Sequence, residues 1–216
     1  MEIKVVKDIL SANEQLAEKN RRLLDSNKVF AVNLMSSPGA GKTSLILQTI
    51  KKLKGKARVG VIEGDVSSSL DAETVSKEGV PVVQINTDGG CHLDANMIGD
   101  VLGKLPLGDI DLLFVENVGN LICPAEFALG AHKKVVISSI SEGHDKPLKY
   151  PLMFHVADAV LVNKIDLAPY LNFDNEAFSQ ALKGMNREAK IFPISCTTGE
   201  GIERWASWLL TQVNRG

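Results

Sequence analysis

The chain has few of the features that mark several large classes of protein. Its formal net charge is only −2, so it has no broad basic surface for nucleic acids or anionic membranes. No apolar run approaches the roughly 20 residues that span a bilayer, and the segment from Met1 to Lys4 lacks a signal-peptide core. The three cysteines are an odd number, which argues against a disulfide framework. We therefore expect a cytoplasmic protein with free thiols, and neither nucleic acid nor membrane as its partner.

The 216 residues, 44% of them hydrophobic, are enough for one well-buried α/β domain. Residues 4–25 place apolar side chains at helical spacing, and from residue 29 onward β-rich runs alternate with helical stretches. Strands are predicted near 29–35, 58–63, 81–86, 111–116, 134–140, 157–163 and 190–194, and helices near 42–53, 70–78, 94–104, 147–155, 174–187 and 200–213. This rhythm predicts a mostly parallel central sheet flanked by helices, with residues 1–28 as an N-terminal helical appendage and 29–216 as one domain.

A phosphate-binding loop is predicted between the first strand and the helix that follows it. The loop continues into the helix with the residues Pro38, Gly39, Ala40, Gly41, Lys42, Thr43 and Ser44. Backbone N–H groups in such a loop cradle phosphates, the lysine reaches the β and γ phosphates, and the threonine hydroxyl binds Mg²⁺. Ser36 stands where the G-x-x-x-x-G-K-[ST] pattern has its first glycine. The fold class is therefore predicted to be a P-loop NTPase.

A second motif indicates which base is bound. Asn163, Lys164 and Asp166 form an N-K-x-D motif after an apolar strand, and the carboxylate can accept from N1–H and the exocyclic amine of guanine. Adenine does not present that pair of donors, so GTP and GDP are the predicted nucleotides. After the last strand, the residues placed to contact the base through backbone amides are Ser195, Cys196 and Thr197. Cys196 is therefore interpreted as a small, partly buried residue rather than a metal ligand.

Acidic residues after two further strands are candidates for the magnesium sphere. Asp65 ends one predicted strand and Glu116 begins an E-x-x-G turn with Gly119, and Mg²⁺ prefers a few carboxylates together with waters and phosphates. Asp65 could also orient the attacking water. Asp71 is a second candidate for that role, with helix capping as an equal alternative. Lys42, Asp65 and Glu116 are the predicted catalytic residues.

A set of soft ligands defines a predicted second metal site. Cys91 and His92 are adjacent in a glycine-rich turn, and Cys123 follows the E-x-x-G turn by four residues. Both loops follow parallel strands and should emerge at the same carboxyl edge. Two thiolates and an imidazole suit Zn²⁺ or Ni²⁺, and water, Asp94 or a second subunit could supply a fourth ligand. Because Glu116 and Gly119 precede Cys123 so closely, a loop shift could couple nucleotide state to metal binding.

Taken together, these motifs resemble the nickel-incorporation GTPases of hydrogenase maturation, the HypB family. The resemblance rests on the segments 36–43, 63–66, 90–95, 116–124 and 163–166 and extends over nearly the whole chain. It implies GTP hydrolysis, a SIMIBI-type P-loop fold for the GTPase domain of residues 29–216, and a GTP-favoured homodimer with the Cys91, His92 and Cys123 site near its interface. It also implies two partners, a hydrogenase maturation protein and the hydrogenase large-subunit precursor. No N-terminal cysteine-rich or histidine-rich tract is present, so metal handling is expected to depend on this site alone.

Several alternatives stay open at this level. A urease-type nickel accessory GTPase has a similar fold but typically carries Cys-Pro-His, whereas Cys123 and Pro124 are followed here by Ala125. A regulatory GTP switch with a structural zinc site is a candidate of another class. The segment 150–154 is expected either at the dimer interface or in a helix packed on the core, and Trp205 and Trp208 are interpreted as packing residues.

Overall fold

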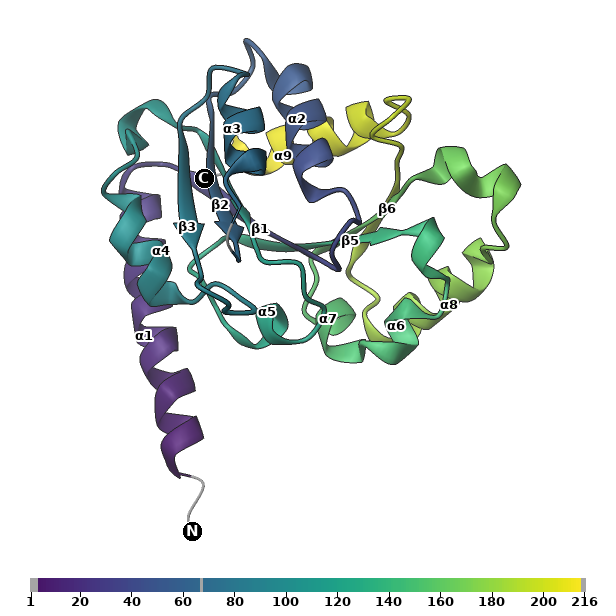
Figure 1. Cartoon of the computed structure of the whole chain (residues 1–216), viewed down its shortest axis with the longest axis horizontal. Helices are drawn as coiled ribbons and strands as arrows, with labels where there is room; N and C mark the ends of the chain where they lie inside the picture. Colours follow the sequence, from purple (N-terminus) through teal and green to yellow (C-terminus); the bar gives the residue numbers. More distant parts are fainter. Residues whose placement is uncertain (1–3, 67, 215–216) are drawn as a thin grey trace.

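Within the described residues, 4–66 and 68–214, the computed structural model has one seven-stranded sheet in the order β3-β2-β4-β1-β5-β6-β7 (Figure 1). The strands are β1 (Phe30–Ser36), β2 (Val59–Asp65), β3 (Val82–Asn86), β4 (Leu112–Glu116), β5 (Lys133–Ser139), β6 (Ala159–Asn163) and β7 (Lys190–Pro193). Every pairing between neighbouring strands is parallel. The predicted strands are confirmed, and the sheet is wholly rather than mostly parallel.

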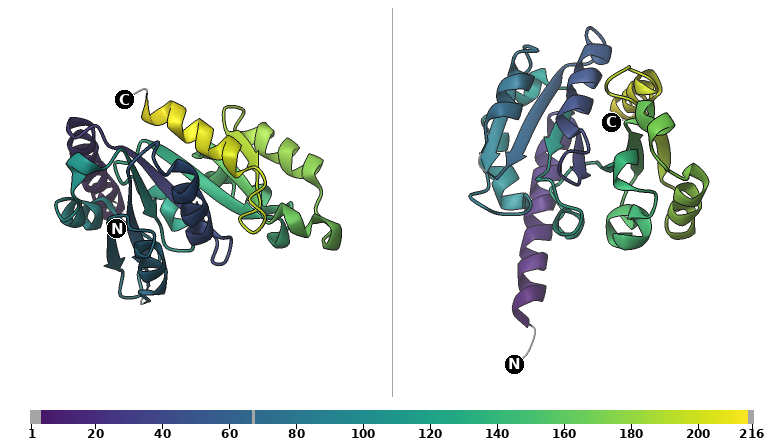
Figure 2. Two further views of the ribbon diagram at one scale, coloured as in Figure 1. Left: turned by 90° about the horizontal axis from the view of Figure 1, so that it is seen from above. Right: turned by 45° about the vertical axis from the view of Figure 1, so that its right-hand side comes forward.

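Helices lie on both faces of the sheet (Figures 1 and 2). The α-helices are α1 (Lys4–Ser26), α2 (Lys42–Leu53), α3 (Leu70–Ser76), α4 (Ala95–Leu102), α5 (Cys123–Glu126), α6 (Lys146–Lys149), α7 (Pro151–His155), α8 (Asn175–Met185) and α9 (Ile202–Val213). The 3₁₀-helices are η1 (Leu107–Asp109), η2 (Ile140–Glu142) and η3 (Ile165–Tyr170). The single helix expected over 147–155 is wrong: Tyr150, with φ −129° and ψ 57°, separates α6 from α7. The physical reason is Pro151, because proline disfavours helical backbone at the residue before it.

Side chains alternate between the two faces along the strands, as the pleat requires. Val32 and Leu34 of β1 face the cluster that contains α2 and α9, whereas Ala31 and Met35 belong to the clusters on the opposite side. Because helices cover both faces, most strand residues are apolar and buried. The core is therefore a three-layer arrangement with the sheet at its centre.

The C-terminal helix confirms the packing role of the two tryptophans. Trp205 is fully buried, and its Nε1 donates to Thr49 Oγ1 of α2 at 3.0 Å. Trp208 stacks on it with ring centroids 5.3 Å apart. The pair therefore packs α9 against α2 and the core.

Helix α1 contacts the body through polar as well as apolar residues. Leu24 is buried with α4, and Asn13 and Asn20 are also buried. Asn13 accepts from the backbone N–H of Ala95, and Asn20 donates to the carbonyl of the same residue. The first turns of α1 extend beyond the sheet (Figures 1 and 2). Across the ranges 4–66 and 68–214, every helix is too short or too polar to cross a membrane.

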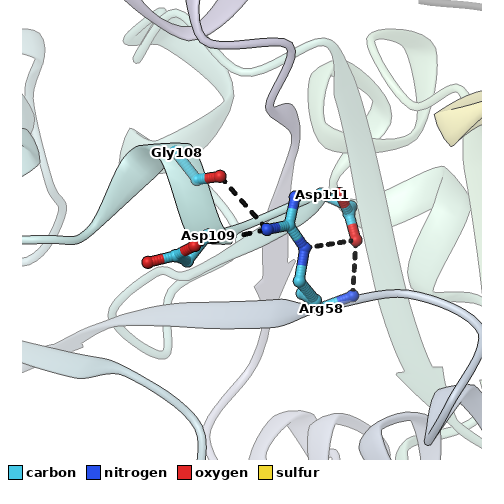
Figure 3. Close-up of polar contacts among 4 residues, drawn as sticks. All are labelled: Arg58, Gly108, Asp109 and Asp111. Carbon is cyan, nitrogen blue, oxygen red and sulfur yellow. Dashed lines mark hydrogen bonds and ion pairs between the residues drawn. The ribbon is translucent and has the colours of Figure 1, made fainter.

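An ion pair closes the amino edge of the sheet (Figure 3). Arg58, just before β2, donates from its Nη2 to Oδ1 of Asp111 at 2.7 Å and from its backbone N to Oδ2 at 2.7 Å. Its Nη1 also donates to the carbonyl of Gly108 and to Asp109. These bonds join the starts of β2 and β4, at the end of the sheet away from the predicted sites.

Candidate functional site

The carboxyl edge of the sheet gathers all the predicted functional segments, because every strand points the same way. The phosphate loop follows β1, the Cys91–His92 turn follows β3, and residues 195–197 follow β7. The segment 116–123 begins with the last residue of β4, and the N-K-x-D motif begins with the last residue of β6. A wholly parallel sheet therefore places the residues predicted to bind nucleotide and those predicted to bind metal at the same edge.

The phosphate loop has the backbone that a tight cradle requires. Gly39 and Gly41 have φ values of 73° and 103°, in the left-handed region that favours glycine. Helix α2 begins directly afterwards at Lys42, so its N-terminus points toward the loop. A Cβ on Gly41 would overlap the side chain of Asn163, which donates from Nδ2 to the Ala40 carbonyl at 2.8 Å. The loop is thus shaped by its own glycines and held by the N-K-x-D motif.

Lys42 and Thr43 meet Glu116 at the start of α2. The Thr43 hydroxyl donates to Glu116 Oε1 at 3.0 Å, and Lys42 Nζ lies 3.9 Å from the same oxygen. Lys42 also donates to the Ser36 hydroxyl at 3.2 Å, so the serine in the glycine position acts as an acceptor. Glu116 Oε2 is buried without a partner among the described residues, which fits a cation ligand.

Glu63 joins this acidic group, although the motifs did not point to it. Carboxylate oxygens of Glu63, Asp71 and Glu116 all lie within 4.8 Å of one another. Burial and the neighbouring Glu116 raise the pKa of Glu63 to about 10. Burial also raises the pKa of Glu116, against the opposing effect of Lys42. An acidic residue directly after the apolar run 59–62, still within the strand, was the available signal.

Asp65 occupies the end of β2, next to this group along the chain. Its Oδ1 accepts from the backbone N–H of Ser68 at 2.8 Å, and the side chain is half-buried. The structure therefore brings Glu63 and Asp71 to Glu116, while a magnesium or water-orienting role for Asp65 stays a prediction.

The base-binding motif is rigidly held. Asp166 Oδ1 accepts from the Ser195 hydroxyl at 2.5 Å. Asn163 Oδ1 accepts from the backbone N–H of Cys196 at 3.2 Å, and Lys164 Nζ donates to the Gly39 carbonyl at 2.8 Å. Burial raises the pKa of Cys196 to about 11, which keeps it a thiol. Cys196 is half-buried and Thr197 exposed, and both follow the strand beside the motif.

Cys91, His92 and Cys123 converge on one another. Their ligand atoms lie within 4.8 Å, with the two sulfur atoms 3.2 Å apart and Cys91 Sγ 3.5 Å from His92 Nδ1. The hydrogen bond shared with Cys91, together with burial, raises the pKa of the Cys123 thiol, and burial lowers the pKa of His92. Asp94 Oδ1 caps α4 by accepting from Met97 N at 2.8 Å. Two sulfurs and a neutral imidazole form a donor set for a borderline-soft cation.

Two further contacts on the nucleotide side involve Glu142, which the sequence did not single out, and the predicted Gly119. Glu142, in η2 after β5, accepts from the Ser37 hydroxyl of the phosphate loop. Gly119 packs so closely on the same loop that a Cβ there would lie 3.0 Å from Pro38 Cα. The E-x-x-G glycine therefore allows the segment after β4 to contact the phosphate loop.

Comparison with known proteins matches these features to one family. Residues 30–193 match the family described as CobW/HypB/UreG, nucleotide-binding domain. The chain is 50% identical to the hydrogenase maturation factor HypB of Escherichia coli K12, and the match covers 95% of this chain and 71% of that protein. It is 46% identical to the probable HypB of Methanocaldococcus jannaschii, over 93% of the chain and 90% of that protein.

Solved structures agree with this assignment. HypB of Archaeoglobus fulgidus superposes with a TM-score of 0.88 at 42% identity, covering 94% of this chain and 99% of that one. HypB of Helicobacter pylori in complex with nickel superposes at 0.89 and 35% identity, covering 94% and 96%. More distant likenesses, at a TM-score of 0.57, are a LAO/AO transport system kinase and the signal recognition particle receptor FtsY. The predicted SIMIBI-type P-loop fold is thereby confirmed.

Proposed function

This chain belongs to the HypB group of the CobW/HypB/UreG family, and we propose that it is a GTP-hydrolysing metallochaperone for nickel insertion during nickel–iron hydrogenase maturation. One observation carries the proposal. The thiol and imidazole ligands of Cys91, His92 and Cys123 converge at the same sheet edge as the phosphate loop. Cys123 also lies on the segment that begins with Glu116, which bonds Thr43 of that loop.

The nucleotide chemistry is assigned to residues around the start of α2. Bound magnesium would neutralise charge on the phosphates, held by Thr43 and Glu116 and by Asp65. Lys42 would contact the β and γ phosphates, and Asp65 would also orient the attacking water. The buried, partner-free Oε2 of Glu116 supports a cation at this place. Asp166 would select guanine, since the hydroxyl of Ser195 donates to its carboxylate and holds it in place.

Nickel is treated as the cargo rather than a resident cofactor. We assign it to Cys91, His92 and Cys123, with Zn²⁺ as the other cation that this donor set suits. Three protein ligands leave a coordination position open, which favours transfer over permanent storage. The H. pylori relative was solved in complex with nickel, which supports a nickel-binding member of this family.

We further propose that GTP favours a homodimer and that the partners are a hydrogenase maturation protein and the large-subunit precursor, acting in the cytoplasm. In the segment 150–154, Met153 and Phe154 are buried in the core, so the core-packing alternative is correct for them. Leu152 is 44% exposed and Leu148 67% exposed, and they offer apolar surface for the interface. Residues 1–28 are proposed as an appendage that braces the GTPase domain of residues 29–216.

Metal transfer tests the proposal directly. Protein loaded with Ni²⁺ under reducing conditions would be given GTP or GDP, and release to a chromogenic chelator would be followed. We expect the two nucleotides to give different release rates, and the Lys42→Ala variant to lose that difference. Equal release with GTP, GDP and no nucleotide would contradict a metallochaperone driven by GTP.

A urease-related role is the second candidate. It is favoured by one relative, the hydrogenase/urease maturation factor HypB of H. pylori, which is 38% identical over 97% of this chain. Transfer of nickel from the loaded protein to a hydrogenase precursor or to apo-urease would separate the two roles. A regulatory switch with structural zinc would instead retain its metal in both nucleotide states.

A further inference from the structure

The segment between the proposed nucleotide ligand Glu116 and the metal ligand Cys123 contains two asparagines that bond the Cys91–His92 turn. Asn117 is fully buried, and its Oδ1 accepts from the backbone N–H of Leu93, the residue after His92, at 3.0 Å. Asn120 donates from Nδ2 to the Cys91 carbonyl at 3.3 Å. The turn that carries two of the three metal ligands is thus held from both ends by the segment that begins at Glu116.

This segment is also fixed to the phosphate side. Asn117 donates through its backbone N to the Leu34 carbonyl at 3.0 Å and through Nδ2 to Asn33 Oδ1 at 3.2 Å, both in β1. Gly119, between the two asparagines, lies against Pro38 of the phosphate loop. Segment 116–120 thus contacts β1 and the phosphate loop on one side and the metal turn on the other.

A second set of bonds, made by Asn13, holds the start of α4 just after the Cys91–His92 turn. Asn13 of α1 accepts from Ala95 N at 2.9 Å and donates to the Ala128 carbonyl at 2.9 Å. Asn13 thus links the start of α4, beyond His92, to the chain after α5, beyond Cys123. The chain thereby offers a buried asparagine that supports the surroundings of the metal ligands from α1 rather than from segment 116–120.

We propose that Asn117 and Asn120 are positioning residues that transmit the nucleotide state to the Cys91–His92 turn. This role presupposes the proposed function, because the hydrogen bonds of the two asparagines would let the bound nucleotide regulate the metal site. Both side chains act through hydrogen bonds: each fixes where the turn lies, and Asn120 also hydrogen-bonds the thiol of Cys123. A ligand that favours one placement of segment 116–120 would then change the affinity for metal, and metal would change the affinity for that ligand by the same factor.

The test is the coupling ratio, which is the ratio between the Kd for Ni²⁺ with GDP and the Kd for Ni²⁺ with a non-hydrolysable GTP analogue. The Kd for Ni²⁺ would be determined with GDP and with a non-hydrolysable GTP analogue, in the wild type and in N117A, N120A and N13A, together with the Kd for each nucleotide without metal. In the wild type we expect the two Ni²⁺ constants to differ by about 5- to 150-fold, the usual range of coupling between sites. N117A and N120A should bring the ratio to about one without abolishing nucleotide binding.

The N13A variant separates coupling from simple loosening of the turn. It should weaken Ni²⁺ binding equally in both nucleotide states and keep the wild-type ratio. If N117A and N120A also keep that ratio, the inference is overturned while the proposed function stands. A wild-type ratio of one would sink both the coupled metallochaperone and the inference. Should N117A fail to fold, N120A decides alone, because Asn120 is half-buried and its bond is peripheral.

Discussion

The sulfur atoms of Cys91 and Cys123 lie 3.2 Å apart, although 32 residues separate these cysteines along the chain. The distance follows from topology, since one thiol is in the loop after β3 and the other is at the start of α5, the helix after β4. Strand β2 alone lies between those strands in the sheet. Two loops that cross toward each other over one strand can share a cation, and this juxtaposition leads to the first prediction.

Removing one thiol should weaken metal binding selectively. We expect Cys123→Ala to lower Ni²⁺ and Zn²⁺ affinity by more than the roughly 10- to 100-fold typical of losing an outer-shell partner. Cys196→Ala is the matched control, since Cys196 lies beside the base-binding motif. Competition with a metallochromic dye under reducing conditions measures both variants. Unchanged affinity in the Cys123 variant would remove it from the ligand set.

Replacing the phosphate-loop lysine should stop turnover. Lys42→Ala removes a cation that lies 3.9 Å from Glu116 and 3.2 Å from the Ser36 hydroxyl. We expect GTP hydrolysis to fall at least about 100-fold, the usual loss when one transition-state donor is removed. Lys104→Ala, an exposed lysine far along the chain, serves as the control. Phosphate release would be measured, and a Lys42 variant with wild-type turnover would refute the assigned role.

Base selection should depend on a single carboxylate. Asp166→Ala leaves no acceptor for N1–H and the exocyclic amine of guanine, at a cost of about 1–3 kcal/mol, or roughly 5- to 150-fold in affinity. ATP affinity should change little, so the GTP to ATP preference narrows. Asp100→Asn, on an exposed position of α4, controls for loss of charge. Titration with fluorescent nucleotides tests this, and an unaltered preference would argue against guanine readout by Asp166.

The C-terminal helix should contribute strongly to stability. Trp205→Ala removes a fully buried indole and its bond to Thr49, and we expect a loss of about 3–5 kcal/mol in the free energy of unfolding. Trp208→Ala should cost less, because that ring is half-buried. Urea denaturation followed by circular dichroism gives both values. Equal losses would mean that the stacked pair, rather than burial of Trp205, anchors the helix.

The ion pair at the amino edge should make stability depend on acid pH. Hydrogen bonds from Arg58 lower the pKa of Asp111, so the folded state favours the carboxylate more than the unfolded chain does. This contribution is present above the unfolded pKa and is lost as pH falls through the lower, folded pKa. Asp111→Asn should therefore be less stable than the wild type at pH 7, with a difference that shrinks on acidification.

The neighbouring Asp109 provides the comparison for that experiment. It lies 3.4 Å from the same arginine and its side chain is 81% exposed, so Asp109→Asn should have a smaller effect at every pH. Urea midpoints from pH 7 down to pH 3 would show the trend. A gap between wild type and Asp111→Asn that widens in acid would contradict the assigned shift.

Local motifs allowed much of the molecule to be predicted. The alternation of β-rich and helical runs gave the seven strands, because each element is set by side chains near one another in sequence. The loop around Lys42 and the motif ending at Asp166 are each a continuous stretch of sequence. A few neighbouring residues therefore specify the backbone geometry that each requires. The cysteines were placed together by one rule, that parallel strands share a carboxyl edge.

Contacts between distant segments were decided only by the tertiary structure. Glu63 lies beside Glu116 because β2 and β4 pair with those residues in register, and a one-residue slip would turn either side chain to the other face. Asn117 bonds Leu93, next to His92, from 24 residues away, and Asn13 bonds Ala95 at the start of α4 from 82 residues away. The sequence by itself determined which ligands exist and which edge carries them. The strand register and the packing of α1 decided which residues hold those ligands in place, because hydrogen bonds between remote elements depend on positions that no local pattern specifies.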